Sequence, residues 1–510
     1  MNPAAHSSSL KALQAENAQL LQRALAAEAQ SQETREKLAQ LAHELAQLKR
    51  LIFGTKSERF EPAAAADQLP LFLTAGTGEA PATDLVVQPK STGDGAPATH
   101  ARRKPVRQEL PAHLRREVVV IEPDIDTSGL RRIGQEVSET LDYRAAKLIV
   151  IRRERPKYVD PNDEARGVIV APLPPRPIEK GMAEPALLAN VLVEKYVDHL
   201  PLYRQVQRFT RQGITLATST LGDWAAASAE LLVPLYRALI VEARASGYIQ
   251  ADETPIPVQD AEEKGKTHRG YYWVYHAPLG GLVVVRYEEG RGRDGPAEWL
   301  KDYRGALQSD GYAVYDAFDG WPGITSYGCW AHARRYFHEA LENEPEKAAY
   351  ALEEIQALYE IERSLRETDP SPENRVRVRT DDAVPILERF RTWLEANPGL
   401  PKGPWGKAVA YSLARWRRLS RYVEDGRIEI DNNLVENAIR PIALGRKNYL
   451  FAGSHEAAQR AAVIYSLLAT CKKHEVNPQT WLTDVLSLVP THPHKKVGEL
   501  LPHHWKIRKV

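Results

Sequence analysis

Three acidic residues of this chain have the surroundings expected of a metal site. Glu436 lies in the stretch 430–440, where helical spacing places it on a polar face among amide side chains. Asp252 and Asp310 each end an apolar, strand-like run, in the sequences Tyr-Ile-Gln-Ala-Asp and Gly-Ala-Leu-Gln-Ser-Asp. Mg²⁺ prefers oxygen ligands, and carboxylates on two strands and one helix can surround such an ion. We therefore predict that these three carboxylates bind a divalent metal ion.

The elements around these residues decide which other acids stay outside the site. The helix that carries the glutamate should begin at Asp431, a natural N-cap, and end at Pro441. Glu253 should point to the face of the strand opposite Asp252, because strand side chains alternate. Glu429 is the remaining acidic neighbour. A single acidic residue is ordinarily a solvated surface charge, so the prediction depends on the motifs in which the three acids occur.

Those motifs form an ordered series along the chain. They are Leu51–Arg59, Asp252–Thr254, Ser309–Tyr312, Cys329–Arg335 and Asp431–Asn448. With this series the chain resembles, over nearly its whole length, transposases of the insertion sequence 66 family. The resemblance implies a DDE transposase with an RNase H-like catalytic domain, in which Asp252, Asp310 and Glu436 are the catalytic and metal-binding residues. Cleavage and strand transfer would then use two Mg²⁺ (or Mn²⁺) ions.

Other polar residues are expected to support this site or hold DNA. His332 and Asn433 would support the metal ligands from outside the coordination sphere. Cys329 and His332 could instead form a metal pair or hold a cysteine nucleophile, but no second cysteine is near in sequence, so a structural or DNA-positioning role is favoured. The predicted DNA-binding residues are Arg440, Arg446, Lys447, Asn448, Arg334, Arg335, Arg208, Arg211, Arg102, Arg103 and Lys104. Those that follow Glu436 could alternatively balance the charge of the three acidic residues.

Composition excludes several classes of protein. The 510 residues carry a formal net charge of +1, which neither requires nor excludes a nucleic-acid partner. The two cysteines, Cys329 and Cys471, cannot build a disulfide framework or a four-cysteine zinc site. No run approaches the ~20 apolar residues of a membrane helix, and no signal-peptide core is visible. We expect a bacterial cytoplasmic protein associated with the nucleoid, without membrane contact.

The expected fold class is α/β, with an all-α insertion in the catalytic domain and smaller modules before it. The expected units are a coiled coil with a basic segment (1–60), a disordered linker (61–100), a small β-rich module (101–170), a helical region resembling a helix-turn-helix (178–245), an RNase H-like catalytic domain (246–341 and 426–455), a helical insertion (342–425) and a C-terminal helical region (456–510).

The N-terminal stretch 10–52 has a heptad pattern whose ends are stronger than its middle. One seam position holds Leu10, Asn17, Ala24, Ser31, Leu38, Leu45 and Ile52. The other holds Leu13, Leu20, Ala27, Thr34, Leu41 and Leu48. A self-associating coiled coil is predicted, and a solvated amphipathic helix is the alternative. The residues at 61–100 are rich in Ala, Pro, Gly and Thr, which is typical of a linker.

The β-rich module departs from the pattern of the family that the chain resembles. That family commonly has a cysteine-ligated zinc finger at this position, whereas here the segments 122–127 and 158–161 contain no cysteine. We predict that the module holds no zinc, because carboxylates do not replace thiolates in a structural zinc site. Strands are expected at Arg115–Ile121 and Lys147–Val159, with Gly129–Gly134 between them.

The helical region and the catalytic domain follow in order. Helices separated by a turn at Gly213 could form a DNA-binding helix-turn-helix or an ordinary helical hairpin. Strands are then expected at 248–258, 271–276, 282–287 and before Asp310, with a fifth strand and a helix in 324–341. If the first and fourth strands are neighbours, Asp252 and Asp310 lie side by side.

Three functions remain open from the sequence. The first is a transposase acting on double-stranded DNA, as a homo-oligomer and with accessory proteins of the same element, as the resemblance implies. The second is a DNA-binding regulator that has lost catalysis, which the three intact acids disfavour. The third is an RNase H-like nuclease that cuts without joining, whose site would contain the same acids.

Overall fold

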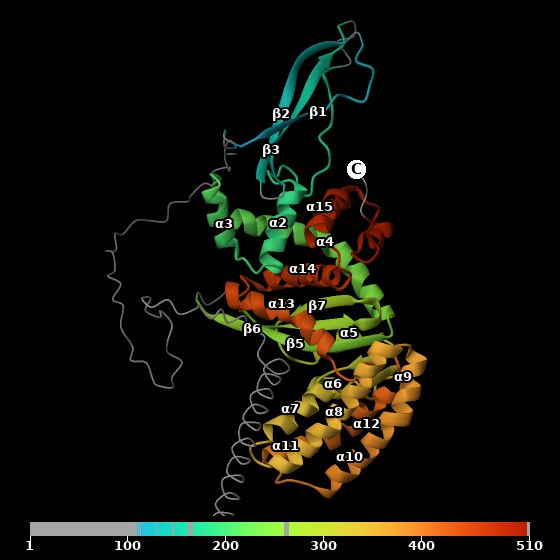
Figure 1. Cartoon of the computed structure of the whole chain (residues 1–510). Coiled ribbons are helices and arrows are strands. Elements are labelled where there is room, and N and C mark those ends of the chain that lie inside the picture. The colour runs from blue at the N-terminus through green and yellow to red at the C-terminus, as the bar shows by residue number, and fades with distance from the viewer. Residues whose placement is uncertain are drawn as a thin grey trace, which may run out of the picture. The chain divides into compact units, whose positions relative to one another are not determined.

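The structure, a computed structural model, describes residues 110–161 except 111, 113, 129 and 145–146, then residues 167–259 and 265–506. The predicted coiled coil at 10–52, the predicted linker at 61–100 and the basic residues Arg102, Arg103 and Lys104 lie outside the described residues. The predicted mixed α/β class is confirmed, because two sheets and many helices alternate along the chain (Figure 1).

The first sheet occupies the β-rich region. Its strands are β1 (Arg116–Val120), β2 (Arg131–Arg144), β3 (Lys147–Val159) and β4 (Ile169–Val170). β3 pairs in parallel with β1 and antiparallel with β2 and β4. The sequence indicated β1 and β3 but treated residues 129–134 only as a connection, whereas β2 begins at Arg131. Contacts across the sheet stabilise β2, such as the 3.1 Å ion pair between Glu139 and Arg116, and these are not visible in the sequence of one strand.

Three helices come next. They are α2 (Pro185–Tyr196), α3 (Leu202–Arg211) and α4 (Thr218–Ala245). The turn between α3 and α4 contains Gly213, whose φ of 79° lies in the left-handed region that favours glycine. By length and composition, α4 is the one helix in the described part of the chain that could cross a membrane. In this fold it is a core helix, since Leu232, Leu235 and Leu239 are fully buried.

The second sheet is mixed and has five strands. They are β5 (Tyr248–Gln259), β6 (Thr267–Ala277), β7 (Leu282–Glu288), β8 (Gly305–Gln308) and β9 (Ile324–Tyr327). The strand order is β7-β6-β5-β8-β9. β5, β6 and β7 are antiparallel neighbours, and β8 and β9 run parallel to β5. The first and fourth strands of this sheet are therefore neighbours.

Different helices cover the two faces of this sheet. The helices after β7 are α5 (Asp294–Leu300), α6 (Ala313–Asp316) and α7 (Trp330–Glu339). Tyr275 of β6 stacks on Trp299 of α5, with ring centroids 3.8 Å apart. Tyr272, three residues earlier and on the opposite face, donates a hydrogen bond to the carbonyl oxygen of Ala458 in α14 (His455–Lys473). Asp252 pairs with Val274 and so shares the face of Tyr272, which α14 covers.

The segment between α7 and the Glu436 helix is helical, as its apolar spacing predicted. Its helices are α8 (Pro345–Thr368), α9 (Pro372–Val378), α10 (Val384–Ala396), α11 (Pro404–Ala414) and α12 (Trp416–Ser420). They enclose a second core that includes Ile355, Leu358 and Phe390. Arg379, in a π-helical turn before α10, is fully buried and bonded to both carboxylate oxygens of Glu362.

Two predictions about the glutamate helix were wrong. The helix, α13 (Asn433–Tyr449), begins after an N-cap at Asn432 and continues through Pro441. Asp431 lies one residue before the cap, although its Oδ1 accepts a hydrogen bond from the N–H of Asn433 at 3.1 Å. The proline is tolerated because the carbonyl that loses its partner belongs to exposed Asn437, and because Ile442 remains buried against the core.

Candidate functional site

β5 and β8 bring Asp252 and Asp310 to the same level of the sheet. The strands pair in parallel, with Gln250 opposite Gln308. Two residues further along lie Asp252, still within β5, and Asp310, just beyond the end of β8. Because side chains alternate, each aspartate shares a face with the glutamine that precedes it. Residues 58 positions apart in the chain are thereby made neighbours, as was expected if these strands paired.

The turn that carries Asp310 is held by the helical insertion. Oδ1 of Asp310 accepts a hydrogen bond from the N–H of Tyr312 at 2.8 Å, and its carbonyl oxygen accepts one from the hydroxyl of Tyr411 in α11. Gly311 has a φ of 88°, and a Cβ there would lie 2.5 Å from Nε of Arg415. Arg415 also donates to the carbonyl oxygen of Gly311 at 2.9 Å. Glycine is therefore required where the turn meets the insertion.

Glu436 joins this group from the first turn of α13, which packs on β5. Burial raises the pKa of Asp252 from 3.8 to about 8, and the negative charges of Asp310, Glu253 and Glu436 add to the rise. The N–H of Glu253, which donates to Oδ1 of Asp252 at 2.7 Å, opposes it. The three predicted ligands therefore share one partly buried, negatively charged region.

This donor set fits hard divalent cations. All three side chains offer carboxylate oxygens, which Mg²⁺ and Mn²⁺ accept, and a cation would offset the repulsion that raises the pKa of Asp252. The ligand oxygens of the three residues do not all lie within 4.8 Å of one another.

The two residues predicted to support the ligands differ in what they contact. Nδ1 of His332 lies 3.8 Å from Oε1 of Glu436 and 3.3 Å from Sγ of Cys329. Asn433 does not face the glutamate in the same way, since its Nδ2 donates to Oδ2 of Asp431 at 2.8 Å. His332 is thus the residue of the pair that contacts Glu436. Cys329 is fully buried, and burial raises the pKa of its thiol, which argues against a nucleophilic role.

Two of the acidic residues expected to be outside the site, Glu253 and Glu429, have cationic partners. Glu253 pairs with Arg291, whose Nε donates to its Oε1 at 2.8 Å. Glu429 pairs with Arg375 at 3.1 Å and with Arg366 at 3.0 Å. Burial opposes ionisation of Glu429, but these two positive charges hold its pKa below the ordinary value.

The predicted DNA-binding residues fall into two groups. Exposed side chains belong to Arg211, Arg335, Arg440 and Lys447. Others make contacts within the protein: Arg446 donates to the hydroxyl of Thr254 at 3.1 Å and to the carbonyl of Pro255, Arg208 pairs with Glu194, and Nδ2 of Asn448 donates to the carbonyl oxygen of Leu444 at 3.2 Å. Arg334 is partly buried. Arg446 therefore ties α13 to β5, the strand that carries Asp252.

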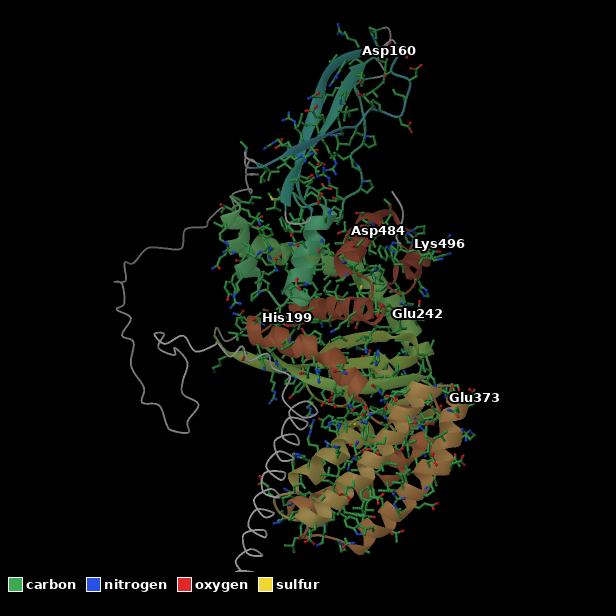
Figure 2. The ribbon with its side chains drawn as sticks, in the orientation of Figure 1. Asp160, His199, Glu242, Glu373, Asp484 and Lys496 are labelled. Atoms are coloured by element: carbon green, nitrogen blue, oxygen red, sulfur yellow. The ribbon has the colours of Figure 1, made fainter. Side chains whose placement is uncertain are left out.

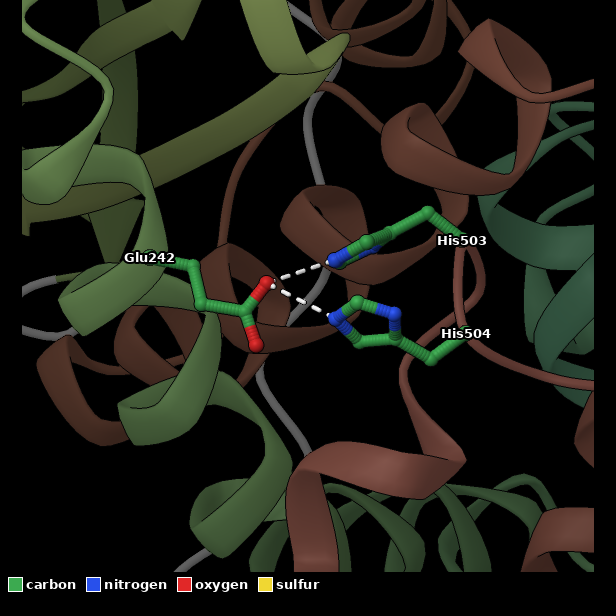
Figure 3. Close-up of side chains that lie close together, drawn as sticks. All are labelled: Glu242, His503 and His504. Atoms are coloured by element: carbon green, nitrogen blue, oxygen red, sulfur yellow. Dashed lines mark hydrogen bonds and ion pairs between the residues drawn. The ribbon is translucent and has the colours of Figure 1, made fainter.

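A separate cluster lies where the C-terminal segment meets α4. Oε2 of Glu242 accepts hydrogen bonds from Nε2 of His503 at 2.6 Å and from Nε2 of His504 at 3.2 Å (Figure 3). Among the described residues, this is the one group of three histidine, cysteine or acidic side chains whose ligand atoms all lie within 4.8 Å of one another. A tetrahedral zinc ion would hold its ligands about 3.3 Å apart, so the 2.6 Å contact is a direct hydrogen bond. The cluster fastens the C-terminal segment to α4.

The same segment has a second attachment. Nε1 of Trp505 donates to Oδ2 of Asp484 at 2.7 Å, and Asp484 belongs to α15 (Pro478–Leu488). Glu242 and Asp484, which hold the two attachments, are both marked in Figure 2.

Two residues that contact the entry to α13 were missed by the sequence reasoning. Gln250 and Gln308 are fully buried, and each precedes a predicted ligand by two positions. The signal that could have revealed them is the repeated Gln-X-Asp sequence at 250–252 and 308–310. A polar side chain two positions from a ligand on a strand shares the ligand's face.

Comparisons with known proteins cover most of the chain. The family model described as "Transposase IS66 family" matches residues 180–460, and that described as "IS66 C-terminal element" matches residues 466–503. A model described as "Transposase C of IS166 homeodomain" matches residues 40–119. The chain is also similar to uncharacterized proteins of Sinorhizobium fredii. Protein y4hP is 33% identical over 491 residues, covering 90% of this chain and 87% of the relative. Protein y4jD is 33% identical over 500 residues, covering 92% of this chain and 95% of the relative.

Proposed function

The chain belongs to the insertion sequence 66 transposase family, and from that membership we propose that it cleaves and joins the DNA of an insertion sequence element at Asp252, Asp310 and Glu436. One observation carries the proposal. The parallel register of β5 and β8 makes the two aspartates neighbours, and α13 adds the glutamate on the face of the sheet that Asp252 occupies.

The sheet supports an RNase H-like catalytic domain. Three antiparallel strands are followed by two strands parallel to the first, in the order β7-β6-β5-β8-β9. The helical insertion then separates Asp310 from Glu436, and its residues Tyr411 and Arg415 return to the turn beside Asp310. The insertion therefore contributes to the shape of the site as well as to the length of the chain.

Each side chain has a defined part in the proposed reaction. The two aspartates and Glu436 would hold Mg²⁺ or Mn²⁺ between the sheet and α13. These cations, when bound, supply charge that activates the attacking water or 3′-hydroxyl and stabilises the leaving oxygen. His332 would orient Glu436 through the contact at 3.8 Å. Loss of the proton from Asp252 must precede binding of a cation, because the protonated carboxyl is a poor ligand.

Double-stranded DNA is the proposed partner. Exposed Arg335, Arg440 and Lys447 lie on α7 and α13, the helices that also carry His332 and Glu436. Positive side chains there would hold backbone phosphates beside the carboxylates. The α3 and α4 helices could add a second contact through Arg211. A homo-oligomer in the bacterial cytoplasm, at the nucleoid and assisted by accessory proteins, completes the proposal.

Two alternatives give different experimental outcomes. A catalytically inactive regulator would bind element ends without cutting them in Mg²⁺. An RNase H-like nuclease would cut but leave no joined product. Matching inverted repeats in the DNA that flanks the coding region would favour the transposase over both.

The central experiment is substitution of Glu436. Glu436→Gln keeps the shape of the side chain but removes the charge that would face the cations, so cleavage of labelled element-end DNA in Mg²⁺ should fall at least about 100-fold while DNA binding is retained. Asp252→Asn and Asp310→Asn should behave alike, and combining two should add little because the three act together.

Two variants serve as controls. Glu253→Gln removes a carboxylate that pairs with Arg291, and Asp431→Asn removes one that faces Tyr359 and Asn433. Both should continue to cleave DNA. Normal cleavage by Glu436→Gln together with inactivity of Asp431→Asn would show that the assignment of the third ligand to Glu436 is wrong.

A further inference from the structure

Gln250 and Gln308 form a buried amide pair beneath the two aspartates. Both side chains are fully buried, on neighbouring parallel strands. Nε2 of Gln250 lies 3.0 Å from Oε1 of Gln308, so the pair links β5 to β8 directly through side chains. The hydroxyl of Tyr248 also donates to Oε1 of Gln308, at 2.5 Å. The strands that carry the aspartates are thereby joined just before each aspartate.

The same groups bind the backbone that leads into α13. Gln250 donates to the carbonyl oxygen of Asp431 at 2.9 Å and accepts from the N–H of Val435 at 3.2 Å. The N–H of Val435 lies in the first turn, where helix N–H groups have no partner four residues earlier. Gln308 donates to the carbonyl oxygen of Glu429 at 2.8 Å. The peptide group that joins Leu434 to Val435, whose N–H also donates to the carbonyl oxygen of Asn432 at 3.1 Å, is therefore held by a side chain from the Asp252 strand, one residue before Glu436.

The hydrogen-bonding capacity of these amides is almost fully used. Nε2 of Gln308 has two donors, and it serves the carbonyl oxygens of Gly328 at 2.9 Å and Glu429. Nε2 of Gln250 has two donors and three acceptors in reach: the hydroxyl of Tyr248, Oε1 of Gln308 and the carbonyl of Asp431. Every amide hydrogen of the two buried glutamines therefore has an acceptor in reach, so the network resists small displacements.

We infer that Gln250 and Gln308 are positioning residues that set the separation between Glu436 and the two aspartates, and thereby determine how tightly the site binds divalent cations. The inference rests on the proposed function, since it takes the three carboxylates to be metal ligands. Neither glutamine needs to touch a cation. Each acts through the backbone of a ligand-bearing element, and Gln-X-Asp is repeated because one glutamine is needed on each strand.

Methionine substitutions test this role. Gln250→Met and Gln308→Met keep the length and apolar stem of the side chain but remove every hydrogen bond of the amide. Mn²⁺ binding by the full-length chain, followed by isothermal titration calorimetry without DNA, should weaken about 10- to 100-fold in each variant. Asp252→Asn identifies which binding events belong to this site. In both methionine variants, the rate of element-end cleavage should fall by a similar factor at low Mg²⁺ and should partly recover at high Mg²⁺.

Thr470→Val is the matched control. Thr470 is also fully buried, and its hydroxyl bonds to the backbone of Val283 in the same sheet at 3.2 Å, but its hydrogen bonds reach only β7 and its own helix. Its loss should lower the melting temperature and leave Mn²⁺ affinity unchanged. Tyr248→Phe is a milder change in the network, since it removes only one hydroxyl, and it should weaken Mn²⁺ binding less than the methionine variants do.

The outcomes separate this inference from the proposed function. Unchanged Mn²⁺ affinity in folded Gln250→Met and Gln308→Met would overturn it, and so would losses equal to those of Thr470→Val at equal melting temperature. If the methionine variants do not fold, unchanged Mn²⁺ affinity in Tyr248→Phe overturns it instead. A wild-type chain that binds Mn²⁺ at Asp252 but cuts no element-end DNA would refute the proposed function alone.

Discussion

Replacing Asp252 by asparagine should stabilise the metal-free protein above neutral pH, although it abolishes the proposed activity. The pKa of Asp252 is about 8 in the folded chain, compared with an ordinary value of 3.8, because the carboxyl is buried beside Asp310, Glu253 and Glu436. Between about pH 4 and pH 8 the folded chain keeps a proton that the unfolded chain has released. The free energy of unfolding must therefore fall as the pH rises through this range.

The size of the effect follows from the pKa values. A tenfold change in proton affinity corresponds to about 1.4 kcal/mol, so ionising Asp252 costs the folded chain on the order of 5 kcal/mol more than the unfolded chain. Asparagine carries no charge and keeps an oxygen that can accept from the N–H of Glu253. If half of the loss is recovered, the melting temperature at pH 8.5 rises by about 3 °C, because the melting entropy of a compact unit of this size is large.

Differential scanning fluorimetry at pH 5 and pH 8.5, with EDTA or Mg²⁺, measures this. Wild-type protein should gain stability from Mg²⁺ mainly at pH 8.5, because cation binding competes with the proton. Asp252→Asn should be more stable than wild type in EDTA at pH 8.5 and should not respond to Mg²⁺. A melting temperature at or below that of wild type under those conditions would refute the idea that the three carboxylates repel one another in a buried site.

Glu429→Gln serves as a control, because at pH 8.5 it should lower the melting temperature whereas Asp252→Asn should raise it. Arg375 and Arg366 surround this carboxylate and lower its pKa despite burial. Its charge therefore stabilises the fold above the ordinary pKa of 4.5, and that contribution is lost as the pH falls through the lowered pKa. The variant should melt at a lower temperature than wild type at pH 8.5.

Three further predictions concern other parts of the chain. Elemental analysis should find no stoichiometric zinc, since the β1–β4 sheet lacks cysteine; zinc that persists in Glu242→Gln, where the histidine cluster is altered, would contradict this. A chain beginning near residue 101 should have a smaller mass per particle in light scattering than the full chain, because the predicted coiled coil is removed, and an unchanged mass would reject self-association through that segment. Glu362→Gln should destabilise the helical insertion by about 3–5 kcal/mol in denaturant unfolding, because fully buried Arg379 loses its charged partner, whereas Glu395→Gln, in the exposed pair with Arg391, should change little.

The sequence by itself determined those features that depend on neighbouring residues. Alternating apolar runs predicted β5 to β7, and the helical spacing of Ile355, Leu358, Ile361 and Leu365 predicted the helix α8, because strand and helix periods are local properties. Of these four residues, all but the partly buried Ile361 are buried. The motifs around Asp252, Asp310 and Glu436 were sufficient to indicate the family, which the comparisons show. The local rule that proline ends a helix predicted that the Glu436 helix stops at Pro441. This prediction was wrong, because buried residues on both sides of the proline stabilise α13 by more than one missing hydrogen bond costs.

The tertiary structure alone decided which distant residues meet. The pairing of β5 with β8 makes two aspartates neighbours, and the energy of that pairing comes from long-range backbone bonds that no sequence period records. The same holds for Gln250 and Gln308, whose partners at residues 429–435 are more than 100 positions away. Arg446, which remains a predicted DNA contact, bonds to Thr254 of β5, and its sequence neighbours do not indicate this partner. The sequence determines which donor and acceptor groups a side chain has, but its hydrogen-bond and ion-pair partners come near it only when the whole chain folds.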